Sequence, residues 1–269
     1  MNDRPGHRWE ASVRTIDLNS DLGESFGPYV MGNDEEMLKI ITSANIACGF
    51  HAGDPLVMHK TLTLAKENGV GIGAHPSFID LWGFGRRPIQ GESPADIEKI
   101  LVYQIAALQG MARTLGLDVG HFKAHGSLGN MAESDAATAE ACARAVKAVT
   151  PDSVFVVLPG NQLEKAGEKM GLRVAREVYA DRAYNDDGTL VSRKLEGAVI
   201  HDPDVALPRL VRMVEEQKIT SISGKKIPVR IDTVCVHGDN PSAVQMSARI
   251  REALTDAGFA LRPLAEFVQ

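Results

Sequence analysis

The sequence predicts an α/β fold, a single TIM-like barrel of seven or eight β/α units, and three observations support this prediction. Short apolar runs without alternating polar residues are typical of strands that are covered on both faces. These runs alternate with longer amphipathic segments through nearly all of the 269 residues, a length typical of one such barrel. No Gly/Ser-rich linker interrupts the series, so we expect residues 13–269 to form one domain, with some irregularity allowed in the barrel.

The apolar runs give the expected strands in chain order. They cover residues 13–19, 43–49, 70–75, 119–125, 153–158, 172–179 and 231–237, and a short last strand is expected at 259–263. Helix start signals follow four of these runs, each with a Ser, Asp or Asn that can cap the first turn. The signals are Asp54-Pro55, Ser93-Pro94, Ser134-Asp135 and Asp239-Asn240-Pro241.

An open, doubly wound sheet is the alternative fold. It should carry a glycine-rich loop after its first strand, where a nucleotide would bind. Residues 17–24, D-L-N-S-D-L-G-E, are acidic and polar instead, and the sequence contains neither G-x-G-x-x-G nor G-x-x-x-x-G-K-[ST]. The barrel is therefore favoured.

Composition excludes several classes of protein. The chain has 29 basic and 35 acidic residues and no basic stripe, so we expect no nucleic-acid partner. No apolar run approaches the ~20 residues that cross a bilayer, so we expect no membrane partner. Residues 1–12 are polar and read as a flexible tail rather than a signal peptide. The three cysteines show no C-x-x-C spacing, which favours a reducing cytoplasm.

Four histidines occupy the same local setting. His51, His75, His125 and His237 each follow an apolar run and precede Gly, Pro or Ala. If the strands are parallel, all four lie at one end of the barrel, where they form a candidate metal or acid–base site.

The first expected strand carries polar residues on one face. Asp17, Asn19 and Asp21 alternate along it, which would turn them into the barrel interior. Carboxyl groups there are costly unless they bind a cation or accept strong hydrogen bonds. Asp21 and the nearby Glu24 have a purely structural alternative in a turn rich in Gly and Asp, and Asp54 has one as a helix N-cap.

Cationic residues follow two other strands. Arg86 and Arg87 end a loop rich in Gly and aromatic residues, which resembles a lid, and a guanidinium group suits a carboxylate or phosphate. Lys123 and His125 alternate on one strand and so face the same way. Asp239 follows His237 and could instead cap the last long helix.

Long motifs resemble the LamB/YcsF family over nearly the whole chain. They are D-L-N-S-D-L-G-E-S-F-G, S-A-N-I-A-C-G-F-H-A-G-D-P, G-A-H-P-S-F-I-D-L-W-G-F-G-R-R, Y-Q-I-A-A-L, F-K-A-H-G-S-L-G-N, Y-A-D-R-A-Y and V-H-G-D-N. The chain departs from the family pattern at residues 77–80, at Ser20 in place of Cys, at Ala124 in place of Pro and at Gly129 in place of Tyr.

The resemblance implies a barrel of the glycoside hydrolase/deacetylase type and the role of the A subunit of 5-oxoprolinase. That enzyme opens the lactam of 5-oxo-L-proline to L-glutamate, with ATP as co-substrate, and works with two other subunits of the B and C type. For this reaction we expect catalytic roles for Asp17, Asp21, Lys123, His125 and Asp239. Substrate or phosphate binding is expected of Asn19, Glu24, Asp54, Arg86, Arg87 and His237.

A divalent metal, Mg²⁺ or a transition ion, is the expected cofactor besides ATP, with Asp17, His51 and His75 as its ligands. The same ligands would serve one alternative function, a metal-dependent, deacetylase-like amidohydrolase that acts on a carbohydrate or other small amide without ATP. The other alternative is a ligand-binding subunit without catalytic activity.

Overall fold

Seven parallel strands close into a barrel in the computed structural model, which describes residues 14–192, 194–200 and 202–269. Their order is β1 (Arg14–Leu22), β2 (Ser43–Ala47), β3 (Gly71–His75), β4 (His121–Phe122), β5 (Val154–Val157), β6 (Arg173–Tyr179) and β9 (Thr233–Val236). Strand β9 pairs back with β1, so the sheet has no open edge between them. This closure confirms the TIM-like barrel and excludes the open sheet.

The short last strand expected at 259–263 is present, but it does not lie between β9 and β1 in the closed barrel. β10 (Phe259–Leu261) pairs in parallel with the first residues of β1, up to Ile16, whereas the pairing of β1 with β9 begins at Asp17. The chain then enters α9 (Leu264–Phe267), whose neighbours lie at the first residues of the barrel strands: the N–H of Leu264 faces the hydroxyl of Ser43 at the start of β2. The N-terminal end of the barrel is thus covered by α9.

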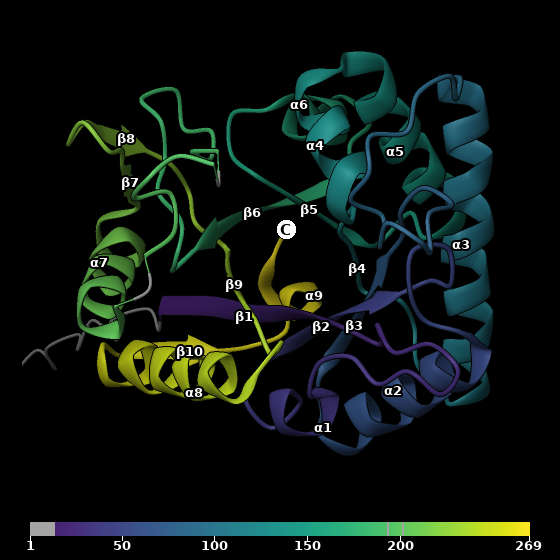
Figure 1. Ribbon diagram of the computed structural model, residues 1–269, viewed down its shortest axis with the longest axis horizontal. Coiled ribbons are helices and arrows are strands. Elements are labelled where there is room, and N and C mark those ends of the chain that lie inside the picture. The colour runs from purple at the N-terminus through teal and green to yellow at the C-terminus, as the bar shows by residue number, and fades with distance from the viewer. Residues whose placement is uncertain (1–13, 193, 201) are drawn as a thin grey trace, which may run out of the picture.

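Four helices begin where the cap signals predicted. These are α2 (Pro55–Glu67), α3 (Pro94–Thr114), α5 (Ala136–Val149) and α8 (Pro241–Asp256). Their first turns are capped by the side chains of Asp54, Ser93, Asp135 and Asn240. In Figure 1, α3 and α5 lie on one side of the barrel and α7 (Pro203–Glu216) and α8 on the opposite side.

The remaining elements had weaker signals in the sequence. They are α1 (Asp34–Met37), α4 (Gly126–Ser134), α6 (Gln162–Lys169) and an antiparallel hairpin of β7 (Lys218–Thr220) and β8 (Lys226–Pro228). Helix α4 contains two glycines in its first turn, which have low helix propensity, and its N-cap, His125, makes no capping hydrogen bond. Its start is fixed by tertiary contact instead, because the N–H of Ser127 donates to the carbonyl of Gly85 at 2.8 Å.

Side chains alternate between two environments along the barrel strands. Leu18 and Ile46 are fully buried in the main apolar core. Their sequence neighbours Asn19 and Asn45 face the barrel interior instead and bond to each other at 2.7 Å. The interior is tightly filled at Gly73, where a Cβ atom would lie 2.1 Å from the ring of His121. The polar interior is therefore a packed layer of hydrogen-bonded groups rather than a pore.

Among the described residues, no helix combines the length and apolar character needed to span a bilayer. Residues 1–12, which we expected to form a flexible tail, lie outside the described part of the chain.

The capping role of Asp54 gives a first prediction. Its carboxylate accepts from the N–H groups of Leu56 and Val57, at 2.8 and 3.0 Å, and from that of Gly27 at 2.7 Å. Asp54→Ala should therefore lower the free energy of unfolding by about 1–2 kcal/mol, while Asp54→Asn, which can still cap, should lose less. Urea denaturation of the three proteins measures this, and equal midpoints would contradict the capping role.

Candidate active site

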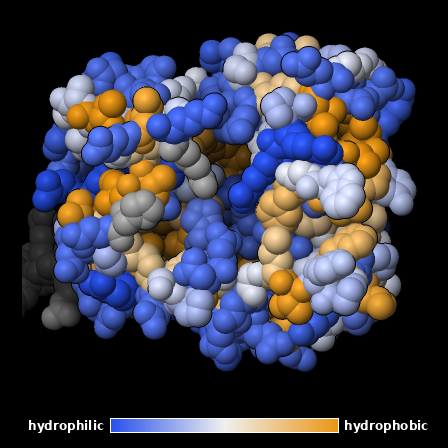
Figure 2. Space-filling model, viewed as in Figure 1, coloured by the Kyte–Doolittle hydropathy of each residue, from blue (hydrophilic) through white to orange (hydrophobic). Residues whose placement is uncertain are grey.

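A cavity of about 530 Å³ opens at the C-terminal ends of the barrel strands, opposite α9. Its lining includes Asp21 near the end of β1, His125 after β4, Tyr179 at the end of β6 and His237 after β9. A second cavity of about 410 Å³ adjoins it and shares Arg86 and His237. The face shown in Figure 2 is hollowed near its centre, where the barrel lies in Figure 1, and hydrophilic residues border the hollow.

Three of the four expected histidines form a cluster at this end. The rings of His51 and His125 stack with centroids 3.8 Å apart, and His75 meets His125 edge-on at 4.8 Å. His237 lies apart from them and stacks on Tyr179 at 6.3 Å. Its Nε2 atom is buried and has no hydrogen-bond partner within the residues that the structure describes.

Glu24 completes the cluster. Its Oε1 atom lies 3.4 Å from Nε2 of His51 and 3.4 Å from Nδ1 of His125. One ligand atom from each of Glu24, His51, His75 and His125 lies within 4.8 Å of all the others, so the group could hold a metal ion. Burial, reinforced by the charge of Asp21, raises the pKa of Glu24 well above its ordinary value. A cation at the cluster would stabilise the ionised carboxylate.

Two backbone carbonyls orient the histidine rings. Nδ1 of His75 donates to the carbonyl of Lys123 at 2.7 Å, and Nε2 of His125 donates to that of Phe84 at 2.9 Å. The opposite nitrogens, Nε2 of His75 and Nδ1 of His125, then carry lone pairs and face each other at 2.9 Å. Two lone pairs repel at this distance unless a proton or a metal ion lies between them. Carbonyls that anchor the far nitrogen are also typical of histidines that bind metals.

Asp17 lies outside the cluster that we expected it to share with His51 and His75. It precedes Asp21 by four residues, or about 13 Å of extended strand, so it lies deeper in the barrel. Its carboxyl group accepts hydrogen bonds from the hydroxyls of Thr42, Ser43 and Thr233. Burial raises its pKa to about 6. Glu24 takes the place in the cluster that was expected of Asp17.

Lys123 is the centre of a buried ion-pair network. Its Nζ atom lies 2.8 Å from Oε1 of Glu177 and 3.2 Å from Oδ1 of Asp21. It also faces Asn19 and the thiol of Cys235, at 3.3 and 3.2 Å. Burial opposes the charge, but these neighbours, Asp21 foremost, raise the pKa of Lys123 well above its ordinary value.

Asp21 connects this network to the histidines. Its Oδ2 atom lies 3.3 Å from Nε2 of His75. Burial alone would raise the pKa of Asp21, but the positive charges of His75, when a proton bridges its Nε2 atom and His125, and of Lys123 outweigh it and hold the pKa well below its ordinary value. Glu177 was not among the expected site residues, although its signal was present: it is an acidic residue in an apolar run, two positions before Tyr179, and so shares its face.

The loop that follows His75 and ends in Arg86 and Arg87, here called the lid loop, directs these two arginines to different partners. Phe84, which adopts a left-handed backbone conformation at φ 54°, places its ring edge-on against His51 and His125. Arg86 then stacks on the Phe84 ring and lines both cavities. The guanidinium group of Arg87 is instead paired with the buried carboxylate of Asp80. Arg86 is thus available to a ligand, whereas Arg87 anchors the loop.

The other expected residues are placed less centrally. Asp54 caps α2, as described above. Asp239 is exposed and lines the smaller cavity, and the capping role considered for it is taken by Asn240, which accepts from the N–H of Ala243. Arg182, which was not among the expected site residues, lies buried in the wall of the larger cavity and donates to the carbonyl of Val191.

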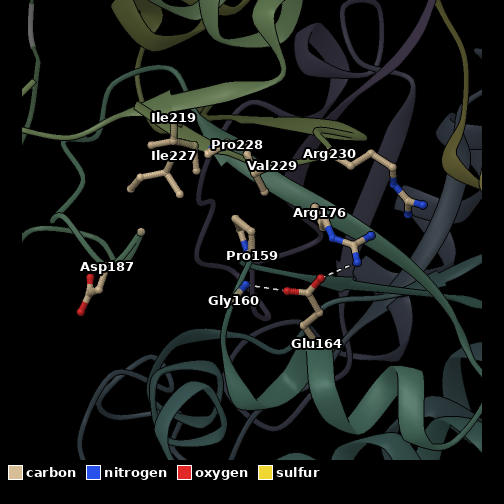
Figure 3. Close-up of a pocket in the computed structure, with 11 residues that line it drawn as sticks. Pro159, Gly160, Glu164, Arg176, Asp187, Ile219, Ile227, Pro228, Val229 and Arg230 are labelled. Carbon is tan, nitrogen blue, oxygen red and sulfur yellow. Dashed lines mark hydrogen bonds and ion pairs between the residues drawn. The ribbon is translucent and has the colours of Figure 1, made fainter. Parts of the chain in front are cut away.

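A third cavity, of about 450 Å³, lies outside the barrel between α6 and the hairpin. In Figure 3, Glu164 lies between the backbone N–H of Gly160 and the guanidinium group of Arg176, and it is bonded to both. Arg230 is paired in turn with Asp232. Glu164, Arg176 and Arg230 at this cleft thus all have charged partners within the protein. The barrel mouth is the better candidate, because Ser127 and His51 each keep a buried polar atom there without a partner among the described residues.

Comparison with known proteins gives a consistent assignment. The family model of the LamB/YcsF family matches residues 16–269. The chain is 55% identical over 249 residues to a Nitrobacter hamburgensis protein named as the A subunit of 5-oxoprolinase, covering 93% of this chain and 98% of that protein. A Campylobacter jejuni protein of the same name is 53% identical over 253 residues, covering 94% and 99%.

A solved structure extends the comparison to three dimensions. The lactam utilization protein from Thermus thermophilus superposes with a TM-score of 0.88 at 44% sequence identity, covering 92% of this chain and 99% of that one. The matches in sequence and in structure both span nearly the whole chain. The chain therefore belongs to the LamB/YcsF family.

Proposed function

We propose that this chain is the A subunit of a 5-oxoprolinase, which hydrolyses the lactam of 5-oxo-L-proline to L-glutamate while ATP is hydrolysed to ADP and phosphate. The names of relatives that are 53–55% identical over more than nine-tenths of the chain support the proposal. The structural observation that carries it is the buried Lys123–Asp21–His75 network, which borders a ligand-sized cavity at the barrel mouth.

The chemistry explains why ATP would be needed. A five-membered lactam is a nearly unstrained amide and resists attack by water. Transfer of the γ-phosphoryl group of ATP to its carbonyl oxygen, with release of ADP, would activate the carbonyl carbon for attack by water. The ring C–N bond would then break to give an amine and an acyl phosphate, and a second water would release phosphate to give glutamate. A site for this reaction needs positive charge for the phosphoryl group, a group that binds the substrate carboxylate and a base that activates water.

Residues at the mouth are assigned to these needs. Arg86 binds the carboxylate or phosphoryl group, since it lines both cavities. Lys123 offsets the negative charge that develops on the carbonyl oxygen. Asp21, which His75 and Lys123 keep ionised, is the base that we favour over His125 and Asp239. Arg87, which was also expected to bind an anion, can do so only if its ion pair with Asp80 breaks.

The remaining expected residues act around this centre. Asn19 orients Lys123 and Glu177 through hydrogen bonds, and His237 offers the free Nε2 atom to a ligand. Asp17 supports the inner end of the network through Thr233, which also binds Asn19. Asp54 holds the loop that precedes α2.

We include in the proposal a divalent metal ion bound by Glu24, His51, His75 and His125. Three imidazole nitrogens and one carboxylate favour a transition ion such as Zn²⁺ over Mg²⁺, which prefers oxygen ligands. When bound, such an ion would polarise a carbonyl or phosphoryl oxygen. The chain's own part is to aim the lone pairs of His75 and His125, through the carbonyls of Lys123 and Phe84.

Two further parts of the proposal concern the setting of the enzyme. No glycine-rich phosphate loop occurs in the sequence, so partner subunits of the B and C type would complete the ATP site. We place the protein in the cytoplasm, which the three buried and unpaired cysteines support.

The alternative without ATP is favoured by one observation, the nitrogen-rich cluster itself, which suits a metal-dependent amidohydrolase. The first experiment therefore measures glutamate release from 5-oxoproline with and without ATP, by the isolated chain and by its complex with co-purified partners. We expect glutamate only from the complex with ATP. Turnover that needs the metal but not ATP would replace our proposal with the alternative.

Replacement of Asp21 tests the assigned base. Asp21→Asn keeps the size of the side chain but loses the negative charge, so kcat of the complex should fall by ~10²–10⁴-fold. Asp54→Asn, which alters a carboxylate that caps α2 and accepts from the N–H of Gly27, is the control. Circular dichroism confirms that both variants are folded. An Asp21→Asn enzyme with full turnover would remove Asp21 from the mechanism.

Metal binding is tested without an activity assay. The purified chain, stripped with a chelator and titrated with Zn²⁺ in a calorimeter, should bind close to one ion per chain. The double variant His75→Ala, His125→Ala should lose this binding, because it removes both converging lone pairs. His59→Ala changes an exposed histidine on α2 and should bind like the unmodified chain. Absence of binding by the unmodified chain would leave a shared proton as the explanation of the histidine contact.

A further inference from the structure

The larger cavity extends away from the histidine cluster along one face of α4. Gly126, Ser127, Gly129, Asn130 and Glu133 line it, and their spacing places them on a single side of the helix. The six-residue step from Ser127 to Glu133 corresponds to ~9 Å along the helix axis. A small lactam bound beside Asp21 and His125 would leave the Glu133 end of the cavity unfilled.

Glu133 is the one acidic group on this wall, and its carboxyl group lacks a partner. No hydrogen bond or ion pair to it occurs in the part of the chain that the structure describes, although the residue is partly buried. Burial, reinforced by the charge of Glu177, raises the pKa of Glu133 to about 7. By contrast, Glu140 on the neighbouring α5 is paired with Lys169. A partly desolvated carboxyl group that faces a cavity without a protein partner is available to a hydrogen-bond donor of a ligand.

Part of the remaining lining is apolar, although Asn130, Thr189 and Ser192 also contribute to it. Gly129 contributes no side chain, and a Cβ atom there would lie 3.2 Å from the carbonyl oxygen of Ala124. Leu158, Leu190 and Val191 line the same cavity. A ligand that reaches Glu133 from the ring-opening site can thus pass beside glycine and aliphatic side chains.

We propose that the Glu133 end of the cavity is a specificity subsite for lactams that are longer than 5-oxoproline, namely five-membered lactams with an aliphatic extension that ends in an amine or another hydrogen-bond donor. The Glu133 carboxylate binds the donor, and the extension lies beside Gly129, Leu158 and Leu190, which line the cavity. This inference rests on the proposed function, because it places the lactam ring beside Asp21 and His125.

Two synthetic ligands test the subsite. Both join 5-oxoproline through its carboxyl group to the same methylene chain, which ends in an amine in one ligand and in a methyl group in the other. Calorimetry of the isolated chain, at a pH above the pKa of Glu133, should show the amine ligand binding about tenfold more tightly or better, the value of one charge-assisted hydrogen bond. Glu133→Gln should remove most of this preference.

Ser134→Ala is the matched control, since Ser134 is exposed on the same helix and its hydroxyl bonds only to carbonyls of its own turn. It should keep the preference for the amine ligand. Equal affinities of the two ligands for the unmodified chain, or an unchanged preference in Glu133→Gln, would overturn the subsite. Turnover of 5-oxoproline by the complex is measured in parallel, so that failure of the proposed function is recognised separately from failure of the subsite.

Discussion

The ammonium group of Lys123 inside the barrel is the constraint on which the site depends. A buried charge is tolerated only when partners compensate it, and here they come from Glu177 on β6 and Asp21 on β1. Removal of one partner would leave an uncompensated charge in a packed interior, which typically costs about 3–5 kcal/mol. The polar layer around it, with Asn19 bonded to Asn45, Glu177 and Thr233, therefore has little freedom to rearrange. The network fixes the relative positions of four strands and so the geometry of the mouth above them.

Lys123 also positions the histidine cluster, through its backbone. Its N–H donates to the carbonyl of Ala74 and its own carbonyl accepts from Nδ1 of His75, so one residue joins the ion-pair network to the ring orientation. The lid contributes the second anchor, the carbonyl of Phe84, which accepts from His125. One anchor, the carbonyl of Lys123, belongs to the barrel, and the other, that of Phe84, belongs to the lid loop. The 2.9 Å contact between the nitrogens of His75 and His125 therefore depends on the lid loop staying packed against α4. Ligand binding that moves the lid would therefore change the cluster.

The features predictable from the sequence were those with local signals. Apolar runs followed by His marked the strand ends, and capping residues such as Ser93 marked helix starts, because burial and hydrogen bonding act there over a few residues. The choice of partners could not be predicted in this way. Arg86 and Arg87 are adjacent in sequence, but Arg87 forms an ion pair with Asp80 whereas Arg86 lines the cavity. Likewise Glu24 rather than Asp17 joins His51, because the depth of a residue along β1 depends on the register of the whole barrel.

The two carboxyl groups of β1 show how the depth of a residue in the barrel determines the direction of its pKa shift. Asp17 and Asp21 share a face of one strand, yet Asp17 meets only hydroxyl groups and its pKa rises to about 6, whereas cationic neighbours hold the pKa of Asp21 well below its usual value. Because the folded-state pKa of Asp17 is raised, its contribution to stability is present at low pH and is lost as the pH rises from 3.8 through about 6. The pKa of Asp21 is shifted in the opposite direction, so folding favours its ionised form and its contribution to stability is lost as the pH falls. A strand can thus carry one carboxyl group whose ionisation is opposed by folding and, four residues later, another whose ionisation is favoured by it.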